Sequence, residues 1–281
     1  SFNKSKITGL SGDQDFLVSG IQYPTIDNLY IARVGHPLSE MYGYVYDGVY
    51  QYEDFNEVSP GVFVLKNGIP NNTQERNTIQ PGDMKLRDIN GDGKVTAEDQ
   101  TVIGHGLPIH TGGFTNNFSY KGFDLSIFFQ WSYGNDVINY NRAKLEDLRG
   151  QHTNQLASAM NHWTPRVDNG DGTYTEGNYT NYLCAVNRNL TNLNTSRVVE
   201  DASFLRLKNV QLGYNFPVKL IKRIGISSLR LYVSGQNLWT WTKYTGYDPE
   251  VSTRNSALTR GFDYSAYPKT TSYTFGIKLG L

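Results

Sequence analysis

The last nine residues of the chain alternate strictly between large apolar side chains and small or polar ones. The apolar positions are Tyr273, Phe275, Ile277, Leu279 and Leu281, and the positions between them are Thr274, Gly276, Lys278 and Gly280. Successive side chains of a β-strand point to opposite faces, so this period of two predicts a strand with one apolar face. Such a strand suits a soluble sandwich with the apolar face inward, or a membrane barrel with that face toward lipid.

The same alternation predicts further strands in the middle of the chain. It runs through residues 114–120, 123–132, 229–234 and, with one change of parity, 204–216. Lys121–Gly122 joins the first two strands as a tight two-residue turn. The change of parity falls near Lys208–Asn209 and predicts a β-bulge there, because a bulge inserts one extra residue into a strand. The chain is therefore predicted to be all-β and antiparallel.

The lengths of the connections favour the barrel over the sandwich. Short turns at 121–122 and 217–228 alternate with long stretches at 133–202 and 243–270. Outer-membrane barrels have short turns on one side of the membrane and long loops on the other. The hydrophobic share of 38% is modest, as expected when only every second strand residue is apolar, and no apolar run approaches the 18 residues of a membrane-spanning helix.

Charge and reactive side chains exclude several functions. The 26 basic and 26 acidic residues cancel, so the chain has no excess of positive charge for a nucleic acid. A single cysteine, Cys184, permits no disulfide within the chain and is expected to pack as a small hydrophobe. The five histidines form no zinc-binding pattern, and no nucleophile with a neighbouring base is evident. An enzyme is therefore not predicted.

Residues 88–99 match the pattern of a calcium-binding loop of the EF-hand type. The expected ligands, at loop positions 1, 3, 5, 7, 9 and 12, are Asp88, Asn90, Asp92, the backbone carbonyl of Lys94, Thr96 and Asp99. Gly93 occupies position 6, where the chain must turn sharply. Position 12 is usually Glu, so Asp99 is one methylene shorter than usual. The loop predicts a bound Ca²⁺ ion with a structural role.

Five tyrosines near the start of the chain share one parity. They are Tyr42, Tyr44, Tyr46, Tyr50 and Tyr52, and they flank Asp47–Gly48, which predicts a hairpin. Their rings either pair across the strands or form an aromatic face that stacks on sugar rings. A soluble, calcium-stabilised β-domain that binds carbohydrate thus remains an alternative. Apolar residues in 140–163 predict one or two helices within the first long stretch.

Several motifs, in the same order along nearly the whole chain, resemble the SusC/RagA family of TonB-dependent outer-membrane receptors. The matching segments are Gly43–Tyr44, Asp47–Gly48, Pro81–Val95, Asp99–Gly104, Tyr120–Gln130, Phe204–Asn209, Leu229–Asn237, Thr245–Glu250, Tyr267–Pro268 and Tyr273–Gly276. The resemblance implies that residues 1–281 form the C-terminal strands and long extracellular loops of a large antiparallel transmembrane β-barrel. The 88–99 loop would then lie within an extracellular loop.

The same resemblance implies a function and partners. Receptors of this family import oligosaccharides or peptides across the outer membrane of Gram-negative bacteria, with a SusD-like surface lipoprotein as a lid. The TonB system supplies the energy through an N-terminal plug, and neither a plug nor the upstream strands are expected within this chain. Family members commonly end in an aromatic residue, whereas this chain ends in Leu281.

Overall fold

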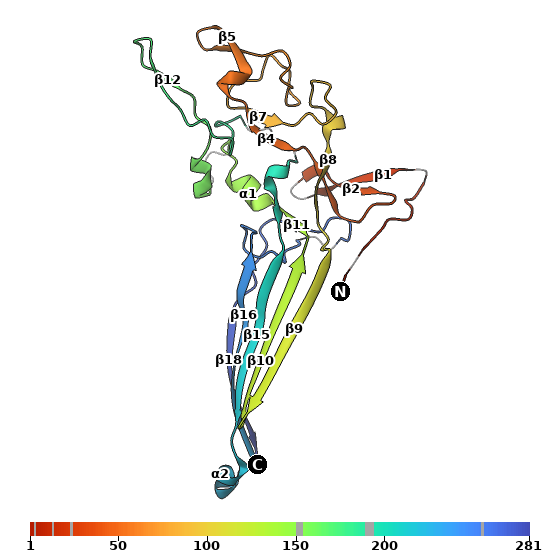
Figure 1. Ribbon diagram of the computed structural model, residues 1–281, viewed down its shortest axis with the longest axis vertical. Helices are drawn as coiled ribbons and strands as arrows, with labels where there is room; N and C mark the ends of the chain where they lie inside the picture. Colours follow the sequence, from red (N-terminus) through yellow and green to blue (C-terminus); the bar gives the residue numbers. More distant parts are fainter. Residues whose placement is uncertain (3, 13, 23–24, 150–153, 189–193, 254–255) are drawn as a thin grey trace.

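The computed structural model describes residues 1–2, 4–12, 14–22, 25–149, 154–188, 194–253 and 256–281. A long, narrow sheet extends from an assembly of loops and short strands (Figure 1). In order across the sheet, its strands are β18 (Ser272–Gly280), β16 (Ser228–Thr242), β15 (Phe204–Asn215), β10 (Phe123–Tyr133) and β9 (His110–Tyr120). All neighbouring pairs are antiparallel. The strands predicted from the alternation are therefore confirmed.

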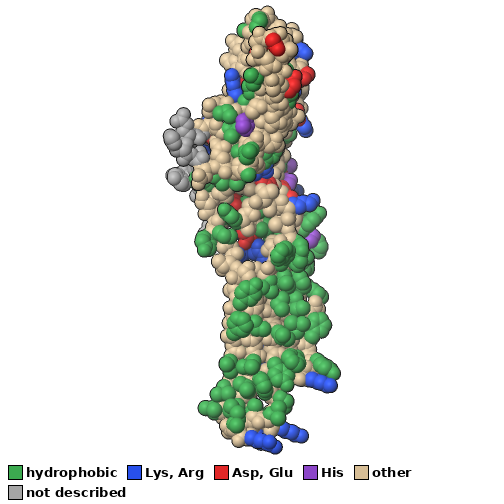
Figure 2. All heavy atoms as spheres, turned by 90° about the vertical axis from the view of Figure 1, so that its left-hand side faces the viewer, with side chains coloured by type: hydrophobic (Ala, Val, Ile, Leu, Met, Phe, Trp, Pro, Cys, Tyr) green, Lys and Arg blue, Asp and Glu red, His purple; other side chains and the backbone are tan. Residues whose placement is uncertain are grey.

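The register of the sheet places apolar side chains on one face of all five strands. One row of directly paired residues runs Phe118, Leu125, Leu212, Val233 and Phe275. The adjacent row on the other face runs Asn117, Ser126, Gln211, Ser234 and Thr274. The apolar face is open to the surroundings, since Phe275 is 81% exposed and Phe118 is 58% exposed. Figure 2 shows hydrophobic side chains spread over this part of the molecule.

The predicted turn and bulge are both present. Lys121 and Gly122 have φ angles of 44° and 90°, the positive values that a type I′ hairpin turn requires at both central residues. The pairing of β15 shifts register by one residue between Leu207 and Asn209, where the sequence changes parity. This bulge lets the strand keep its apolar side chains on one face above and below the shift.

Among the described residues, the loop assembly contains short strands in five small sheets. The four-stranded sheet has β1 (Phe16–Gln22), β2 (Thr25–Arg33), β3 (Glu40–Gly43) and β8 (Thr101–His105), and the three-stranded sheet has β14 (Val199–Asp201), β11 (Asp136–Asn139) and β17 (Phe262–Asp263). The two-stranded sheets pair β4 (Tyr46–Val49) with β7 (Met84–Leu86), β5 (Phe55–Ser59) with β6 (Val62–Leu65), and β12 (Val167–Asp168) with β13 (Tyr174–Thr175). These sheets give the loop assembly regular secondary structure.

The helices of the described residues are few and short. They are α1 (Tyr140–Leu145), α2 (Val218–Ile221) and 3₁₀ turns at Tyr52–Asp54, Ala97–Asp99, Ala157–Met160, Ser196–Val198 and Lys222–Ile224. Among the described residues of 140–163, α1 and the turn at Ala157–Met160 represent the predicted helices, and residues 150–153 lie outside the described part of the chain. In the part of the chain that the structure describes, no helix is long and apolar enough to cross a membrane.

Buried clusters tie distant parts of the chain together. One cluster packs Leu29, Tyr30 and Met41 against Ile138, Val198 and Phe262. A second contains Val49, Met84, Leu86, Val95, Trp163 and Cys184. The prediction for Cys184 is confirmed, because its side chain is buried, and this burial raises the pKa of its thiol to about 12. The two long stretches therefore fold against residues from the first hundred positions.

A buried carboxylate, Glu146, also fastens the assembly. It accepts hydrogen bonds from Arg142, Ser158, Tyr182 and Arg197, which come from four separate segments. Burial opposes ionisation, but these donors outweigh it and lower the pKa of Glu146. A carboxylate removed from water remains charged only when it is paired in this way.

The predicted tyrosine hairpin is wrong. β3 pairs with β8 and β4 pairs with β7, so the segments on either side of Asp47–Gly48 do not pair with each other. Tyr44 and Tyr50 are buried in two different clusters instead of sharing an exposed face. The shared parity does not correspond to one common face, because Tyr42, Tyr46 and Tyr52 are only half-buried.

Candidate functional site

All six residues predicted to bind calcium lie in one loop, between β7 and β8. Asp88 accepts hydrogen bonds from the amides of Gly91 and Gly93, at 2.6 and 2.8 Å. Asn90 and Asp92 each accept from the amide two residues further on, at 2.9 and 2.8 Å. Gly91 and Gly93 have φ angles of 78° and 83°, which favour glycine. The loop is therefore closed tightly around its own acidic side chains.

Asp99 lies at the base of this loop, and its side chain is completely buried. One carboxylate oxygen accepts from the amides of Ile89 and Asn90, at 2.8 and 3.3 Å, and the other accepts from Thr96 at 2.7 Å. Burial disfavours the charged form, but the backbone donors outweigh it and lower the pKa of Asp99. Asp99 therefore joins the two ends of the loop through hydrogen bonds, a role that the motif alone did not reveal.

The side-chain oxygen atoms of the loop are suitable ligands for calcium. In the structure, these oxygen atoms accept hydrogen bonds from backbone amides of the same loop. Among the described residues, no three His, Cys, Asp or Glu side chains are placed so that they could hold a metal ion. Asp88, Asn90 and Asp92 nonetheless supply hard oxygen atoms within five residues, which are the ligands that Ca²⁺ prefers. The calcium site stays a prediction.

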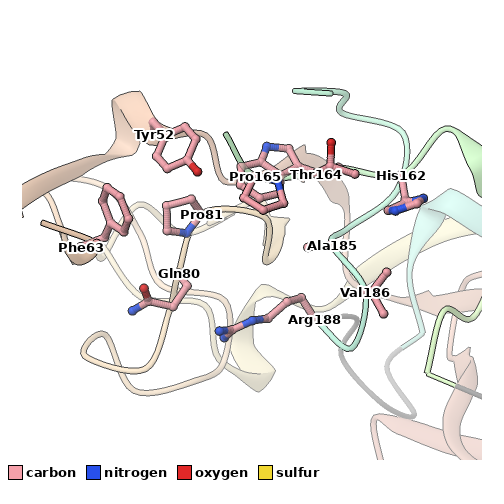
Figure 3. Close-up of a pocket in the computed structure, with 12 residues that line it drawn as sticks. Tyr52, Phe63, Gln80, Pro81, His162, Thr164, Pro165, Ala185, Val186 and Arg188 are labelled. Atoms are coloured by element: carbon pink, nitrogen blue, oxygen red, sulfur yellow. The ribbon is translucent and has the colours of Figure 1, made fainter. Parts of the chain in front are cut away.

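An open pocket of about 370 Å³ lies in the same loop assembly. Figure 3 shows the rings of Tyr52 and Phe63 at one end and the side chains of Gln80 and Arg188 along one side. The Tyr52 ring lies 5.2 Å from the Phe63 ring and 5.5 Å from the Trp163 ring, between centroids. Of the five tyrosines singled out in the sequence, only Tyr52 lines this pocket.

Charged groups border the pocket. Arg188 is half exposed, and its guanidinium lies 3.6 Å from the carboxylate of the buried Asp83. Burial raises the pKa of Asp83, while the amide of Gln80 and the charge of Arg188 oppose that effect. The guanidinium of Arg166 lies 4.8 Å from the centre of the Tyr52 ring. The pocket thus combines aromatic surfaces with an amide and a guanidinium group.

A buried arginine connects the polar face of the long sheet to the loop assembly. Arg206 of β15 donates to Asp248 at 2.6 Å, to Glu250 at 3.1 Å and to Thr240 at 2.9 Å. Gln130 and Lys269 also bind Glu250. This contact places the segment 246–250 over the polar face at its loop end. The sequence offered one signal for it, a lone arginine between Leu205 and Leu207, but nothing to identify its partners.

The chain is similar in sequence to several characterised receptors. It is 35% and 31% identical to two TonB-dependent receptors of Formosa agariphila, and 25% identical to the TonB-dependent receptor SusC of Bacteroides thetaiotaomicron. Each similarity covers 99% of this chain but only 26%, 28% and 23% of the respective relative. The chain therefore spans about a quarter of the length of these relatives. No family model matches the chain.

The fold is similar to solved structures of the RagAB peptide transporter. One has a TM-score of 0.69 and 24% sequence identity over 99% of this chain and 26% of that chain. A structure of RagAB in its open-open state gives a TM-score of 0.65. The similarity confirms the predicted fold class, an all-β chain with strands and long extracellular loops of a large antiparallel transmembrane barrel. In a transmembrane barrel, the apolar face of the sheet is the one that contacts lipid.

Proposed function

Because the chain belongs to the SusC/RagA family of TonB-dependent outer-membrane receptors, we propose that its protein imports an oligosaccharide or a peptide. The chain lies in the outer membrane of a Gram-negative bacterium. It would supply the C-terminal barrel strands and surface loops, residues 1–281, to a barrel of about 22 strands, the size typical of outer-membrane transporters. The upstream strands and the plug would lie outside this chain.

The observation that carries this proposal is the pair of rows across the sheet. The row through Leu125 is apolar on all five strands, and the row through Ser126 is polar on all five. A soluble sandwich would bury the first row against a second sheet, whereas here Phe118, Leu212 and Phe275 of that row are exposed. Such a sheet forms the wall of a pore, with lipid on one side and a polar interior on the other.

The proposed partners follow from the family. A SusD-like surface lipoprotein would close over the loop assembly, and the TonB system would act through the plug. The loop assembly offers a folded surface for such a lid, because its strands and buried clusters are fixed to one another. Both partners are proposals for the whole protein rather than for this chain alone.

Deletion of the gene tests the import function. Growth on one class of nutrient, oligosaccharide or peptide, as the sole carbon source should be lost, while growth on glucose is unchanged. Restoration by the native gene would support the proposal. A deletion strain that grows like the parent on every oligosaccharide and peptide supplied would count against it.

We also propose that the pocket at Tyr52 contacts the substrate before it enters the barrel. Aromatic rings bind the apolar faces of sugars and peptide side chains, while Gln80 and Arg188 offer hydrogen-bond donors. Tyr52→Leu should weaken binding of the imported nutrient by about 1–3 kcal/mol, the range for a contact residue at the centre of an interface.

The pocket prediction is checked by calorimetric titration of the purified protein with the nutrient found by the deletion screen. Tyr267→Leu is the matched control, since Tyr267 is 86% exposed and does not line the pocket. Equal affinities for the native protein and Tyr52→Leu would place substrate binding elsewhere in the barrel.

Calcium binding by the 88–99 loop is a further part of the proposal. Asp88, Asn90 and Asp92 would hold the ion with the backbone carbonyl of Lys94, while Thr96 and Asp99 complete the loop. When bound, the ion would neutralise the carboxylates that the loop brings together. Its role would be structural, because residues 88–99 contain no histidine, cysteine or serine.

Asp92→Ala should weaken calcium binding by at least tenfold, since one of the loop's carboxylate ligands is lost. The measurement is titration of the purified protein with calcium chloride after treatment with a chelator. Asp171→Ala serves as the control, because Asp171 also accepts a backbone hydrogen bond in an exposed Asp-Gly turn that lacks the calcium pattern. An unchanged calcium affinity in Asp92→Ala would exclude this site.

A further inference from the structure

The connection between β15 and β16 is amphipathic and lies at the end of the sheet opposite the loop assembly (Figure 1). It contains α2 and the 3₁₀ turn at Lys222–Ile224. Ile221 is buried and fixes the connection to the sheet, while Val218, Leu220 and Ile224 are 52%, 65% and 70% exposed. Three large apolar side chains thus protrude from a segment of about ten residues.

Basic side chains accompany these apolar ones. Lys219, Lys222 and Arg223 are exposed, and their side chains make no hydrogen bond or ion pair with any described residue. The surrounding end of the sheet, residues 118–124, 213–231 and 276–281, contains six basic residues against one acidic residue, Asp124. That single carboxylate is paired with Arg230. This end of the sheet is therefore strongly positive, although the net charge of the whole chain is zero.

The apolar side chains continue the lipid-facing surface of the sheet. Figure 2 shows hydrophobic side chains down to this end of the molecule and Lys or Arg side chains at its extremity. The long loops are extracellular, so this end lies at the periplasmic surface of the membrane. A segment with protruding apolar residues and basic residues beside them suits the boundary between acyl chains and headgroups.

We propose that residues 217–226 bind the headgroups of anionic phospholipids in the periplasmic leaflet. Leu220 and Ile224 would contact the acyl chains, and Lys219, Lys222 and Arg223 would bind the phosphate groups. The excess of positive charge selects lipids with a net negative charge over zwitterionic ones. The apolar contacts select a lipid over a free phosphate compound.

The test uses the intact protein in detergent, titrated with phosphatidylglycerol and, separately, with phosphatidylcholine, and native mass spectrometry to count bound lipids. Each basic residue near an anionic lipid surface changes affinity about fivefold. The triple variant Lys219→Gln, Lys222→Gln, Arg223→Gln should therefore bind phosphatidylglycerol roughly a hundredfold more weakly. The single variant Lys222→Gln should lose about fivefold and replaces the triple variant if that does not assemble.

Two controls sharpen the test. The variant Lys4→Gln, Lys6→Gln, Lys243→Gln removes three exposed charges from the loop end of the molecule and should bind phosphatidylglycerol like the native protein. Glycerol phosphate, which has the headgroup without acyl chains, should not displace the lipid. The proposal would be overturned if the triple variant bound phosphatidylglycerol with native affinity, or if the control variant lost as much affinity as the triple variant. Displacement of the lipid by glycerol phosphate would also overturn it.

Discussion

Ile127→Arg is expected to lower the free energy of unfolding in a lipid bilayer by about 2–4 kcal/mol. Ile127 lies in the middle of β10, on the apolar face, where it pairs with Val210 and Asn116. An arginine there would place a charge among acyl chains near the centre of the membrane, where no water hydrates it. The measurement is urea unfolding of the intact protein in vesicles, followed by tryptophan fluorescence.

Ser126→Arg is the matched control for this substitution. Ser126 is the neighbouring residue on the same strand, but it pairs with Asn117 and Gln211 on the polar face. An arginine at this position should lower the free energy of unfolding by no more than about 1 kcal/mol, because the interior of the barrel contains water. If Ser126→Arg lowered the free energy of unfolding more than Ile127→Arg does, the Ser126 face would be the covered one and the Ile127 face the wet one. That result would contradict the assignment of the apolar face to lipid.

Arg206→Ala is expected to destabilise the protein by about 3–5 kcal/mol, the range for a buried ion pair that loses one partner. The Arg206 side chain is 3% exposed, and its removal leaves the carboxylate of Asp248 buried without its cation. Segment 246–250 should then detach from the polar face. Unfolding in urea measures the first effect, and faster cleavage of this segment by a protease measures the second.

Arg230→Ala provides the comparison with an exposed pair. Arg230 and its partner Asp124 are each about a third exposed, so water screens their attraction and the loss should be about 0–1 kcal/mol. The double variant Arg206→Ala, Asp248→Ala should lose less than the sum of its single variants, since no charge is left unpaired. Strictly additive losses would show that Arg206 and Asp248 do not act as a pair.

Features that depend on neighbouring residues were predictable from the sequence. The strands, the turn at Lys121–Gly122 and the bulge near Lys208–Asn209 are all confirmed. Each depends on side-chain alternation or on the backbone preferences of adjacent residues. Such a feature can be predicted from one segment of the sequence without knowledge of its partners in the fold. The calcium pattern is equally local, but a pattern of ligands does not by itself bind an ion, and it stays a prediction.

Features that depend on distant partners were not predictable. The tyrosines around Asp47–Gly48 show the same alternation as the true hairpin, yet β4 pairs with β7 about forty residues away. Arg206 and Asp248 are 42 residues apart, and no motif relates them. Asp99 fits a ligand position, but the structure also gives it three amide partners. An alternation of period two indicates that one face of a strand is buried or in contact with lipid. It does not identify what covers that face.

From its sequence alone, the chain is predicted to form antiparallel strands with one apolar and one polar face and to resemble the SusC/RagA family. The tertiary structure adds that the apolar face is largely uncovered, with Phe275 at 81% and Phe118 at 58% exposure. It also decided that the zero net charge divides between a positive periplasmic end and the remainder of the chain. The reason is that alternation is fixed by backbone geometry within one strand, whereas exposure and local charge depend on which strands lie together in space.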